Sequence, residues 1–514
     1  MKQWIKDAVI YEIYPVSFCD ANGDGIGDLK GITSKIPYLK DLGINTVWLN
    51  PCFKSPFRDG GYDVSDYCEI DKKFGTMADF EEMVNSLHAE GIRLVVDFVA
   101  GHTSDKHPWF KGSRKQKPDK RYKDFYIWTT NGLDGEPQTV KGVAPRDGTY
   151  KINFYEFQPA LNFGYGTIRE DAKEWQWHYT DERLKPLRDE MIRTMKFYLK
   201  KGVDGFRVDM AASLVKADFD RKGVRWLWNE MIGEVKKDYP DCCFLAEWGN
   251  PKEAIDCGFD LDYLCHSSEC YNELFRSEPN SNIFRYMEKG HSYFHSDGEG
   301  SAKSFFDYAK EIYDHAGDRG GFSIPTGYHD VVRIHEQKSD DVAKCIYAFI
   351  LTTKAVPQIY YGDEIGIKHN YSVNRDGGFI RTGARTPMQW TTGKNFGFSE
   401  KTRPYLPVDK VKAHTVEEQQ KDENSLLNTL KKLIAIHKKY KALSYGEDMN
   451  VISSGYPTQY ERGKVSGKIY VAINPSARQY KLKISGYKSI ISNNAEYDGE
   501  TLTLNSGSFF IAEE

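Results

Sequence analysis

Ionisable side chains follow four short apolar segments of the 514-residue sequence. The segments are RLVVDFVAGH with Asp97 and His102, GFRVD with Arg207 and Asp209, FLAEW with Glu247, and TGYHD with His329 and Asp330. A single acidic residue at the end of a strand is most often a helix cap or a surface carboxylate. Three candidate strands that each end in a carboxylate favour a shared site instead.

Three carboxylates that converge on one pocket cannot all have the same protonation state. Like charges a few ångströms apart raise at least one pKa, which leaves a protonated acid beside an ionised nucleophile. Such a pair can cleave a glycosidic bond, with retention of configuration when the two groups lie about 5–5.5 Å apart. Arg207 precedes Asp209 by two residues on the same predicted strand, so it could keep the Asp209 carboxylate ionised.

The segments that carry these residues alternate with helical patterns. The apolar runs are VIYEIYP (9–15), NTVWLNP (45–51), RLVVDFVAGH (93–102), VDGFRVD (203–209), FLAEW (244–248), TGYHD (326–330) and PQIYYGDE (357–364). Between two of them, residues 188–202 place Met191, Met195 and Leu199 on one helix face. This alternation predicts an α/β fold, a closed (β/α)8 TIM barrel whose catalytic side chains lie at the carboxyl ends of the strands.

Two stretches interrupt the alternation. Residues 103–187 are aromatic and rich in turns, too long for a loop, and predict a small domain inserted after the third strand. From residue 446 the helical patterns stop, and short strand-like runs predict a C-terminal antiparallel β-sandwich domain over 446–514. The barrel is then expected to comprise residues 1–102 and 188–445.

Composition narrows the functional class. The chain has 70 basic and 74 acidic residues and a net charge of −4, which argues against nucleic acid as a partner. The N-terminus lacks the apolar run of a signal peptide, and no apolar stretch reaches 18 residues, which argues against a membrane span. Nine scattered cysteines without CxxC spacing predict reduced thiols and a cytoplasmic protein.

The segment DANGDGIGDLKG (20–31) has the spacing of a metal-binding loop. Asp20, Asn22 and Asp24 alternate with small residues, so that short oxygen ligands could converge on one hard cation. The twelfth position is Gly31 where an EF-hand has a bidentate Glu, and the preceding run is strand-like, so the loop is not an EF-hand. The alternative is a loop of Asx turns closed by its own hydrogen bonds without a metal.

The strand-end motifs DFVAGH, GFRVDM, AEWG and YHD resemble those of the α-amylase family of glycoside hydrolases (family 13), as do GGYDVSDY (60–67), IYYGDEIG (359–366) and RTPMQW (385–390). The resemblance covers nearly the whole chain in the right order and is closest to the oligo-1,6-glucosidase-like branch. It implies that Asp209 is the nucleophile, Glu247 the general acid/base and Asp330 the third carboxylate that holds the reacting sugar.

The resemblance also implies the residues around that sugar. Asp97, His102, Arg207 and His329 match residues that surround it, and Tyr62 matches the ring on which it stacks. Asp63 with Arg385 (or Arg381) resembles the pair that closes the non-reducing end in exo-acting members. The loop at 20–31 matches a structural Ca²⁺ or other divalent ion site, whose implied ligands are Asp20, Asn22, Asp24, the carbonyl of Ile26 and Asp28. No organic cofactor is implied.

Four positions depart from the family pattern. Gly101 replaces an Asn that binds a second calcium ion in many α-amylases, so that site is expected to be absent. Tyr328 replaces the Asn of the usual NHD motif, and Ala160 replaces the Asp of QPDLN. Ala212 and Ser213 stand where endo-acting α-amylases carry a Lys-His pair, which favours short substrates over starch.

The sequence therefore predicts a retaining, exo-acting α-glucosidase that cleaves short α-1,4 or α-1,6 gluco-oligosaccharides through a covalent glucosyl-aspartate. The alternatives are a transglucosidase or isomerase, trehalose-synthase-like or sucrose-isomerase-like, and an α-amylase. A non-enzymatic subunit of an amino-acid transporter would have a membrane span and would have lost catalytic residues, neither of which applies. The expected ligand is a small oligosaccharide, and the expected state is a monomer or homodimer.

Overall fold

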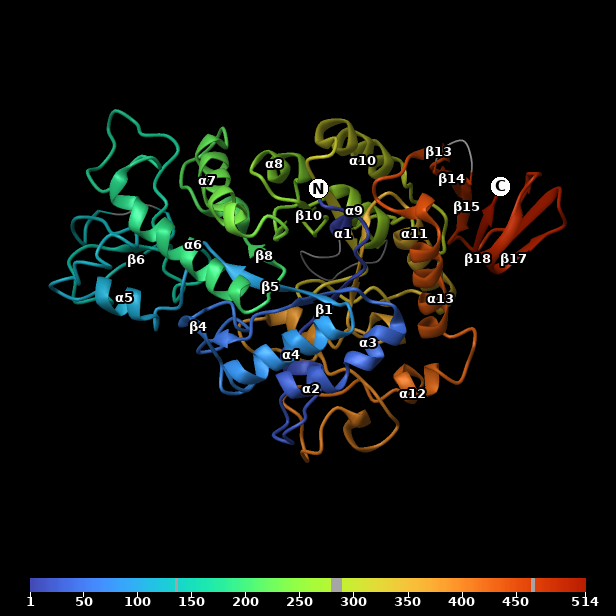
Figure 1. Ribbon diagram of the computed structural model, residues 1–514, viewed down its shortest axis with the longest axis horizontal. Coiled ribbons are helices and arrows are strands. Elements are labelled where there is room, and N and C mark those ends of the chain that lie inside the picture. The colour runs from blue at the N-terminus through green and yellow to red at the C-terminus, as the bar shows by residue number, and fades with distance from the viewer. Residues whose placement is uncertain (135–136, 279–288, 464–466) are drawn as a thin grey trace.

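The computed structural model describes residues 1–134, 137–278, 289–463 and 467–514. Eight parallel strands close into a barrel in the order β1-β12-β11-β10-β9-β8-β5-β2 (Figure 1). Their bounds are β1 Ile10–Ile13, β2 Thr46–Leu49, β5 Arg93–Val99, β8 Gly205–Asp209, β9 Cys243–Ala246, β10 Leu261–Tyr263, β11 Gly321–Pro325 and β12 Val356–Tyr360. The predicted TIM barrel is confirmed.

Most helices follow a barrel strand and lie outside the barrel. The longer helices are α4 Met77–Ala89, α6 Lys185–Lys200, α7 Lys222–Asp238, α10 Lys303–Ala316, α11 Asp340–Thr352 and α13 Leu426–Lys439; the shorter ones are α1 Gln3–Lys6, α2 Leu29–Ser34, α3 Ile36–Leu42, α5 Pro108–Ser113, α8 Pro251–Asp256, α9 Glu269–Phe275 and α12 Val416–Gln419. Helix α6 buries Met191, Met195 and Leu199, as its periodicity predicts. Helix α4 begins at a reciprocal capping box between Thr76 and Asp79.

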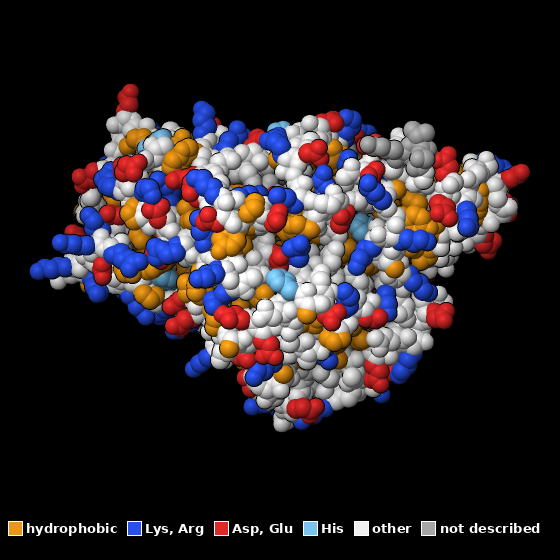
Figure 2. Space-filling model, viewed as in Figure 1, with side chains coloured by type: hydrophobic (Ala, Val, Ile, Leu, Met, Phe, Trp, Pro, Cys, Tyr) orange, Lys and Arg blue, Asp and Glu red, His pale blue; other side chains and the backbone are white. Residues whose placement is uncertain are grey.

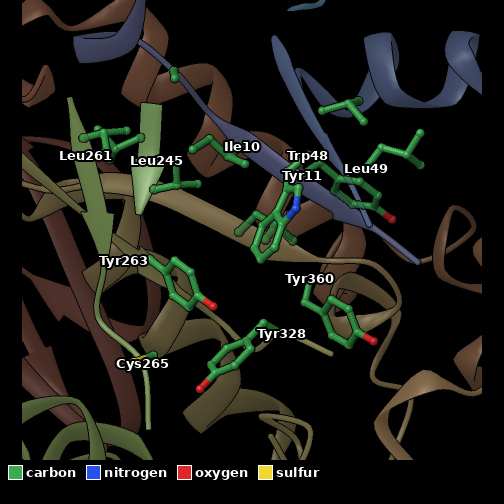
Figure 3. Close-up of a cluster of buried hydrophobic side chains, with 14 of the residues drawn as sticks. Ile10, Tyr11, Trp48, Leu49, Leu245, Leu261, Tyr263, Cys265, Tyr328 and Tyr360 are labelled. Carbon is green, nitrogen blue, oxygen red and sulfur yellow. The ribbon is translucent and has the colours of Figure 1, made fainter. Parts of the chain in front are cut away.

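The barrel interior is filled with aromatic and branched side chains from several strands. Figure 3 shows Ile10 next to Trp48, with Tyr263 and Tyr360 in the same cluster of buried side chains. All of these side chains are buried. Because this packed layer closes the barrel below the strand ends, the polar strand-end residues can gather only at the carboxyl-terminal rim.

The sequence missed one barrel strand and misplaced the end of another. Strand β10 is only three residues long, although Phe259, Leu261 and Tyr263 alternate as a strand requires and all three are buried. Strand β11 ends at Pro325, so TGYHD (326–330) is the loop that follows it and not the strand itself. Both segments are too short for a distinct apolar run, and pairing with neighbouring strands determines them.

Smaller elements lie outside the barrel. Two-stranded sheets form from β3 Phe53–Lys54 with β4 Asp66–Ile70, and from β6 Thr139–Val140 with β7 Tyr150–Lys151. A C-terminal antiparallel sheet contains β13 Met449–Ser453, β14 Thr458–Arg462, β15 Ile469–Asn474, β16 Tyr480–Lys483, β17 Lys488–Tyr497 and β18 Thr501–Glu513 (red in Figure 1). The C-terminal antiparallel domain is confirmed, whereas the exact domain boundaries stay predictions.

Surface charge, the length and apolarity of the helices, and the state of the cysteines are three further properties of the described part of the chain. Acidic and basic side chains intermingle over the face shown in Figure 2. Among the described residues, no helix is long and apolar enough to span a membrane. All nine cysteines are free thiols, and only Cys68 is exposed.

A buried carboxyl beneath the barrel rim gives a pH-dependent stability prediction. Glu364 is fully buried, its Oε1 accepts hydrogen bonds from Tyr11 (2.5 Å) and Tyr38 (2.8 Å), and its Oε2 has no partner. Burial raises the pKa of Glu364 from 4.5 to about 7. The folded state thus retains a proton that the unfolded state loses, and stability falls as the pH rises from 4.5 to 7.

We expect Glu364→Gln to remove this dependence. Relative to the variant, the wild-type free energy of unfolding should fall by about 3 kcal/mol between pH 4.5 and pH 8. Urea unfolding at several pH values measures the difference. A constant difference across this range would show that Glu364 does not titrate there.

Candidate active site

The three carboxylates lie together around one cavity at the carboxyl ends of the barrel strands. Asp209 ends β8, Glu247 follows β9 and Asp330 follows β11. The cavity has a volume of about 310 Å³ and is lined by Asp59, Tyr62, His102, Phe154, Asp209, Met210, Ala212, Ser213, Glu247, Trp248, Cys265, His266, Ser267, Asp330 and Arg381. The structure therefore brings the predicted catalytic carboxylates together with two other predicted sugar-site residues, Tyr62 and His102.

A single buried guanidinium connects the floor of the site. Arg207 is fully buried, and its Nη1 donates to Asp97 (2.6 Å) and to Asp209 (3.1 Å). Its Nη2 lies 2.8 Å from Glu247 Oε2. Arg207 and Asp97 lie below the cavity and do not line it, so their part is to hold the carboxylates that do.

Asp209 and Glu247 both contact this arginine. Burial and the negative charge of Glu247 raise the pKa of Asp209, and Arg207 opposes the rise. The Arg207 guanidinium thus favours the ionised form of Asp209, which a carboxylate nucleophile requires.

Asp330 is held in its ionised form. Its Oδ1 accepts from Arg381 (3.0 Å) and from Arg385 (2.8 Å), and its Oδ2 lies 3.3 Å from His329 Nε2. Burial would raise the pKa of Asp330, but His329, Arg381 and Arg385 hold it well below its usual range. An anionic Asp330 can accept hydrogen bonds from sugar hydroxyls over the whole physiological pH range.

Tyr62 and His102 form a wall of the cavity. The Tyr62 ring stacks on His329, with ring centroids 5.2 Å apart and planes at 11°. His102 Nε2 lies 3.2 Å from the carbonyl oxygen of Tyr62, which can only accept, so Nε2 carries the proton. Burial lowers the pKa of His102 to about 3, so its imidazole is neutral.

The predicted pairing of Asp63 with Arg385 is wrong. Asp63 is fully buried outside the cavity, where its carboxylate accepts from Ser55 (2.9 Å) and lies 3.6 Å from Arg58. The residue that faces the arginines is Asp59, whose Oδ1 lies 3.5 Å from Arg381. The sequence reasoning missed Asp59, because the loop at 58–63 turns back on itself at Gly60 and Gly61, both with positive φ.

Comparison with known proteins decides the family. Residues 12–446 match the family described as "Alpha amylase, catalytic domain". The chain belongs to the α-amylase family. It is accordingly a glycosidase, and Asp209, Glu247 and Asp330 occupy its strand-end motifs.

Relatives of this α-amylase-family chain agree over most of its length. An oligo-1,6-glucosidase of Parageobacillus thermoglucosidasius is 32% identical, over 92% of this chain and 91% of the relative. A trehalose synthase/amylase of Mycolicibacterium smegmatis is 28% identical, over 86% and 77%. The crystal structure of an isomaltulose synthase mutant from Erwinia rhapontici NX5 in complex with D-glucose superposes with a TM-score of 0.83 at 26% identity, over 100% and 99%.

Two departures from the α-amylase family pattern have structural explanations. A Cβ at Gly101 would lie 2.7 Å from Asn153 Nδ2, so an asparagine from the inserted region takes up that space. Lys216 Nζ donates to Asn153 Oδ1 (2.9 Å) and to the Ser213 carbonyl (2.7 Å), which ties the inserted region to the barrel. Tyr328 is fully buried against Tyr263 (centroids 5.3 Å apart) and does not line the cavity.

Trp175 and Trp177 do not cover the active-site cavity. Together they line a separate cavity of about 340 Å³ in the inserted region, with Tyr126, Trp128 and Arg146 among its other residues. Trp175 packs against Tyr165 with ring centroids 6.1 Å apart. These tryptophans therefore belong to the packing of the inserted region.

The loop at 20–28 is closed by side-chain to backbone hydrogen bonds. Asp20 accepts from the amides of Gly23 and Gly25 (both 2.7 Å), and Asp28 accepts from those of Ala21, Asn22 and Gly31. Bonds of the same type run from the Asp24 amide to Asn22 Oδ1 (2.8 Å) and from the Ile26 amide to Asp24 Oδ1 (2.9 Å). Across the described residues, no group of three or more His, Cys, Asp or Glu side chains is placed to hold a metal ion.

Calcium binding by this loop stays a prediction. The Asp24 carboxylate accepts only one of these bonds, and the Ile26 carbonyl lies in the same turn, so oxygen ligands remain for a cation. We expect millimolar CaCl2 to raise the melting temperature and EDTA to reverse the effect, because a ligand of the folded state stabilises it. Asp24→Ala should abolish the increase, and MgCl2 should be compared. An unchanged melting temperature would favour the metal-free Asx-turn loop.

Asp59 lines the cavity and Asp63 does not, so substitutions at the two positions should have different effects. Burial raises the pKa of Asp59 to about 7, against the charge of Arg381, and Gln158 Nε2 donates to its Oδ2 (2.7 Å). We expect Asp59→Asn to lower kcat/KM for short α-glucosides by about 10- to 100-fold, since it removes a negative charge that can accept hydrogen bonds from a sugar in the cavity. Wild-type kcat/KM should also fall as the pH drops through 7, because Asp59 then takes up a proton.

The matched control is Asp63→Asn, four residues away. Asp63 lies outside the cavity, so this variant should keep the wild-type KM even where its melting temperature falls. Steady-state kinetics with maltose and isomaltose compare the two variants. Equal kinetic losses in both variants would contradict the assignment of Asp59.

Proposed function

We propose that this glycosidase is a retaining, exo-acting α-glucosidase of short α-1,4 or α-1,6 gluco-oligosaccharides. Asp209 would attack the anomeric carbon while Glu247 donates a proton to the leaving oxygen. Water, activated by Glu247, would then release α-glucose from a glucosyl-aspartate. The expected ligand is one small oligosaccharide, bound by a monomer or homodimer.

The observation that carries the proposal is the position of Asp59 and Arg381. Both line the same small cavity as the three carboxylates, and Arg381 also contacts Asp330. Opposite charges at this place can bind the hydroxyls of a terminal sugar. The two side chains would then leave no room for a sugar chain that continues beyond that terminal unit. Relatives named oligo-1,6-glucosidase support the same substrate class.

Product analysis tests the proposal. The purified protein is incubated with maltose, isomaltose, sucrose and trehalose, and the products are followed by ¹H NMR from the first minutes. Glucose that appears first as the α-anomer is the expected result. The disaccharide that is cleaved fastest identifies the preferred glycosidic linkage. Glucose that appears first as the β-anomer, or no glucose from any α-glucoside, would overturn the proposal.

A second candidate function is glucosyl transfer or isomerisation by the same intermediate. It is favoured by similarity to the trehalose synthase/amylase and to the isomaltulose synthase structure. Whether water or a sugar accepts the glucosyl group depends on the part of the cavity beyond Glu247, near Trp248 and His266. New disaccharides with little free glucose at high substrate concentration would identify this activity.

A further inference from the structure

Glu12 is a buried carboxyl group for which the proposed reaction has no role. It lies on β1 inside the barrel and is fully buried. Its Oε1 is 2.7 Å from His329 Nδ1, and its Oε2 has no hydrogen-bond partner. The question is whether the proton between Glu12 and His329 belongs to the carboxyl or to the imidazole.

Asn50 does not answer it, because its Nδ2 carries two hydrogens and lies 3.2 Å from His329 Nδ1, 3.1 Å from Tyr62 Oη and 3.2 Å from Asp97 Oδ2. The opposite ring nitrogen does. His329 Nε2 lies 3.3 Å from Asp330 Oδ2, a carboxylate oxygen that requires a donor, so Nε2 carries the proton of the neutral imidazole. Nδ1 is then an acceptor without a proton, and the proton of the short contact lies on Glu12.

The charges around Glu12 agree with this assignment. An ionised carboxylate with one unpartnered oxygen in the barrel interior would be costly, and no Lys or Arg of the described residues forms an ion pair with it. Burial raises the pKa of Glu12; Asp97 on β5 adds to the rise, whereas Arg207 on β8 opposes it. Burial also lowers the pKa of His329, which keeps the imidazole neutral.

We propose that Glu12 is a positioning residue that retains its proton and donates it to Nδ1 of His329, which fixes the imidazole as the Nε2–H tautomer facing Asp330. His329 Nε2 lies 3.3 Å from Asp330 Oδ2, on the side opposite the Oδ1 that Arg381 and Arg385 contact. The imidazole also supports the Tyr62 ring by stacking. Glu12 thus orients two cavity residues through His329, and this role rests on the proposed function of Asp330 as the sugar-binding carboxylate.

Imidazole NMR tests the protonation directly and does not depend on activity. In protein labelled with ¹⁵N-histidine, His329 is assigned by comparison with His329→Gln. Between pH 6 and pH 8, its Nδ1 should have the chemical shift of an unprotonated nitrogen and its Nε2 that of a protonated one. The opposite pattern would overturn the proposal.

Two variants of Glu12 test the consequence for catalysis. Glu12→Gln can still donate to Nδ1 and should keep kcat/KM within about fivefold of wild type, whereas Glu12→Met cannot and should lose about 10- to 100-fold. Glu12→Met leaves the buried Nδ1 without this donor and should lower the melting temperature, so both variants are assayed well below their melting temperatures and their folded state is checked by circular dichroism. Equal losses in both variants would refute the positioning role, and inactivity of the wild type on every α-glucoside would refute the proposed function instead.

Discussion

Asp209→Asn is expected to lower kcat/KM on every α-glucoside by about 10⁴-fold or more. The amide is nearly the same size and can still accept the Arg207 hydrogen bond through its oxygen, so the site should keep its shape. It cannot form a glucosyl ester, and the reaction loses the covalent route that divides one difficult step into two. Initial rates on maltose and on an aryl α-glucoside measure the loss.

Asp209→Gly provides the control for this assignment. The missing side chain leaves space beside the anomeric carbon, and added azide can attack from the same face as the lost carboxylate. Recovery of activity with azide, yielding the β-glucosyl azide, would identify Asp209 as the nucleophile. A variant Asp209→Asn that keeps more than a tenth of the wild-type rate would rule Asp209 out.

The carboxylates near the strand ends could be found from the sequence because strand pairing places them. Strands β8 and β9 are parallel neighbours in which Val208 pairs with Ala246. Asp209 and Glu247 are the residues that come directly after this pair, so their proximity follows from the barrel itself. The predicted roles rest on the resemblance, but their proximity is a property of the fold.

The partners of these carboxylates depend on loops, where spacing along the chain says little about position. Asp59 and Asp63 are four residues apart, and the loop conformation alone decides which one faces Arg381. Gly60 matters here because a Cβ would lie 2.7 Å from Arg385 Nη1. No periodicity in the sequence encodes such an approach between residues more than 300 positions apart.

Glu12 shows a different limit of sequence reasoning. In VIYEIYP it is the single charged residue of an apolar run, and a lone acidic residue is most often solvent-facing. In a closed barrel successive side chains of a strand point alternately inward and outward, and Glu12 belongs to the buried inward set. Its acidity in the interior becomes understandable only when His329, from the opposite part of the chain, is placed beside it.

Glu247→Gln is expected to have an effect that depends on the leaving group. Loss of the general acid should lower kcat/KM about 10²- to 10⁴-fold for maltose, whose leaving alkoxide needs a proton. For an aryl α-glucoside with an acidic phenol, bond cleavage needs no protonation, and the first step should be nearly unaffected. A rapid burst of phenol should then precede slow turnover, because the same residue activates water in the second step.

The structure supplies the reason why glutamine is a suitable probe here. Glu247 Oε2 accepts from the Met210 amide (2.8 Å) and lies 2.8 Å from Arg207 Nη2, and the oxygen of Gln can accept from both donors. The variant should therefore keep the wild-type melting temperature, and its defect should be chemical. An equal loss on maltose and on the aryl glucoside would mean that Glu247 does not protonate the leaving group, and that the acid must be sought among the other residues of the cavity.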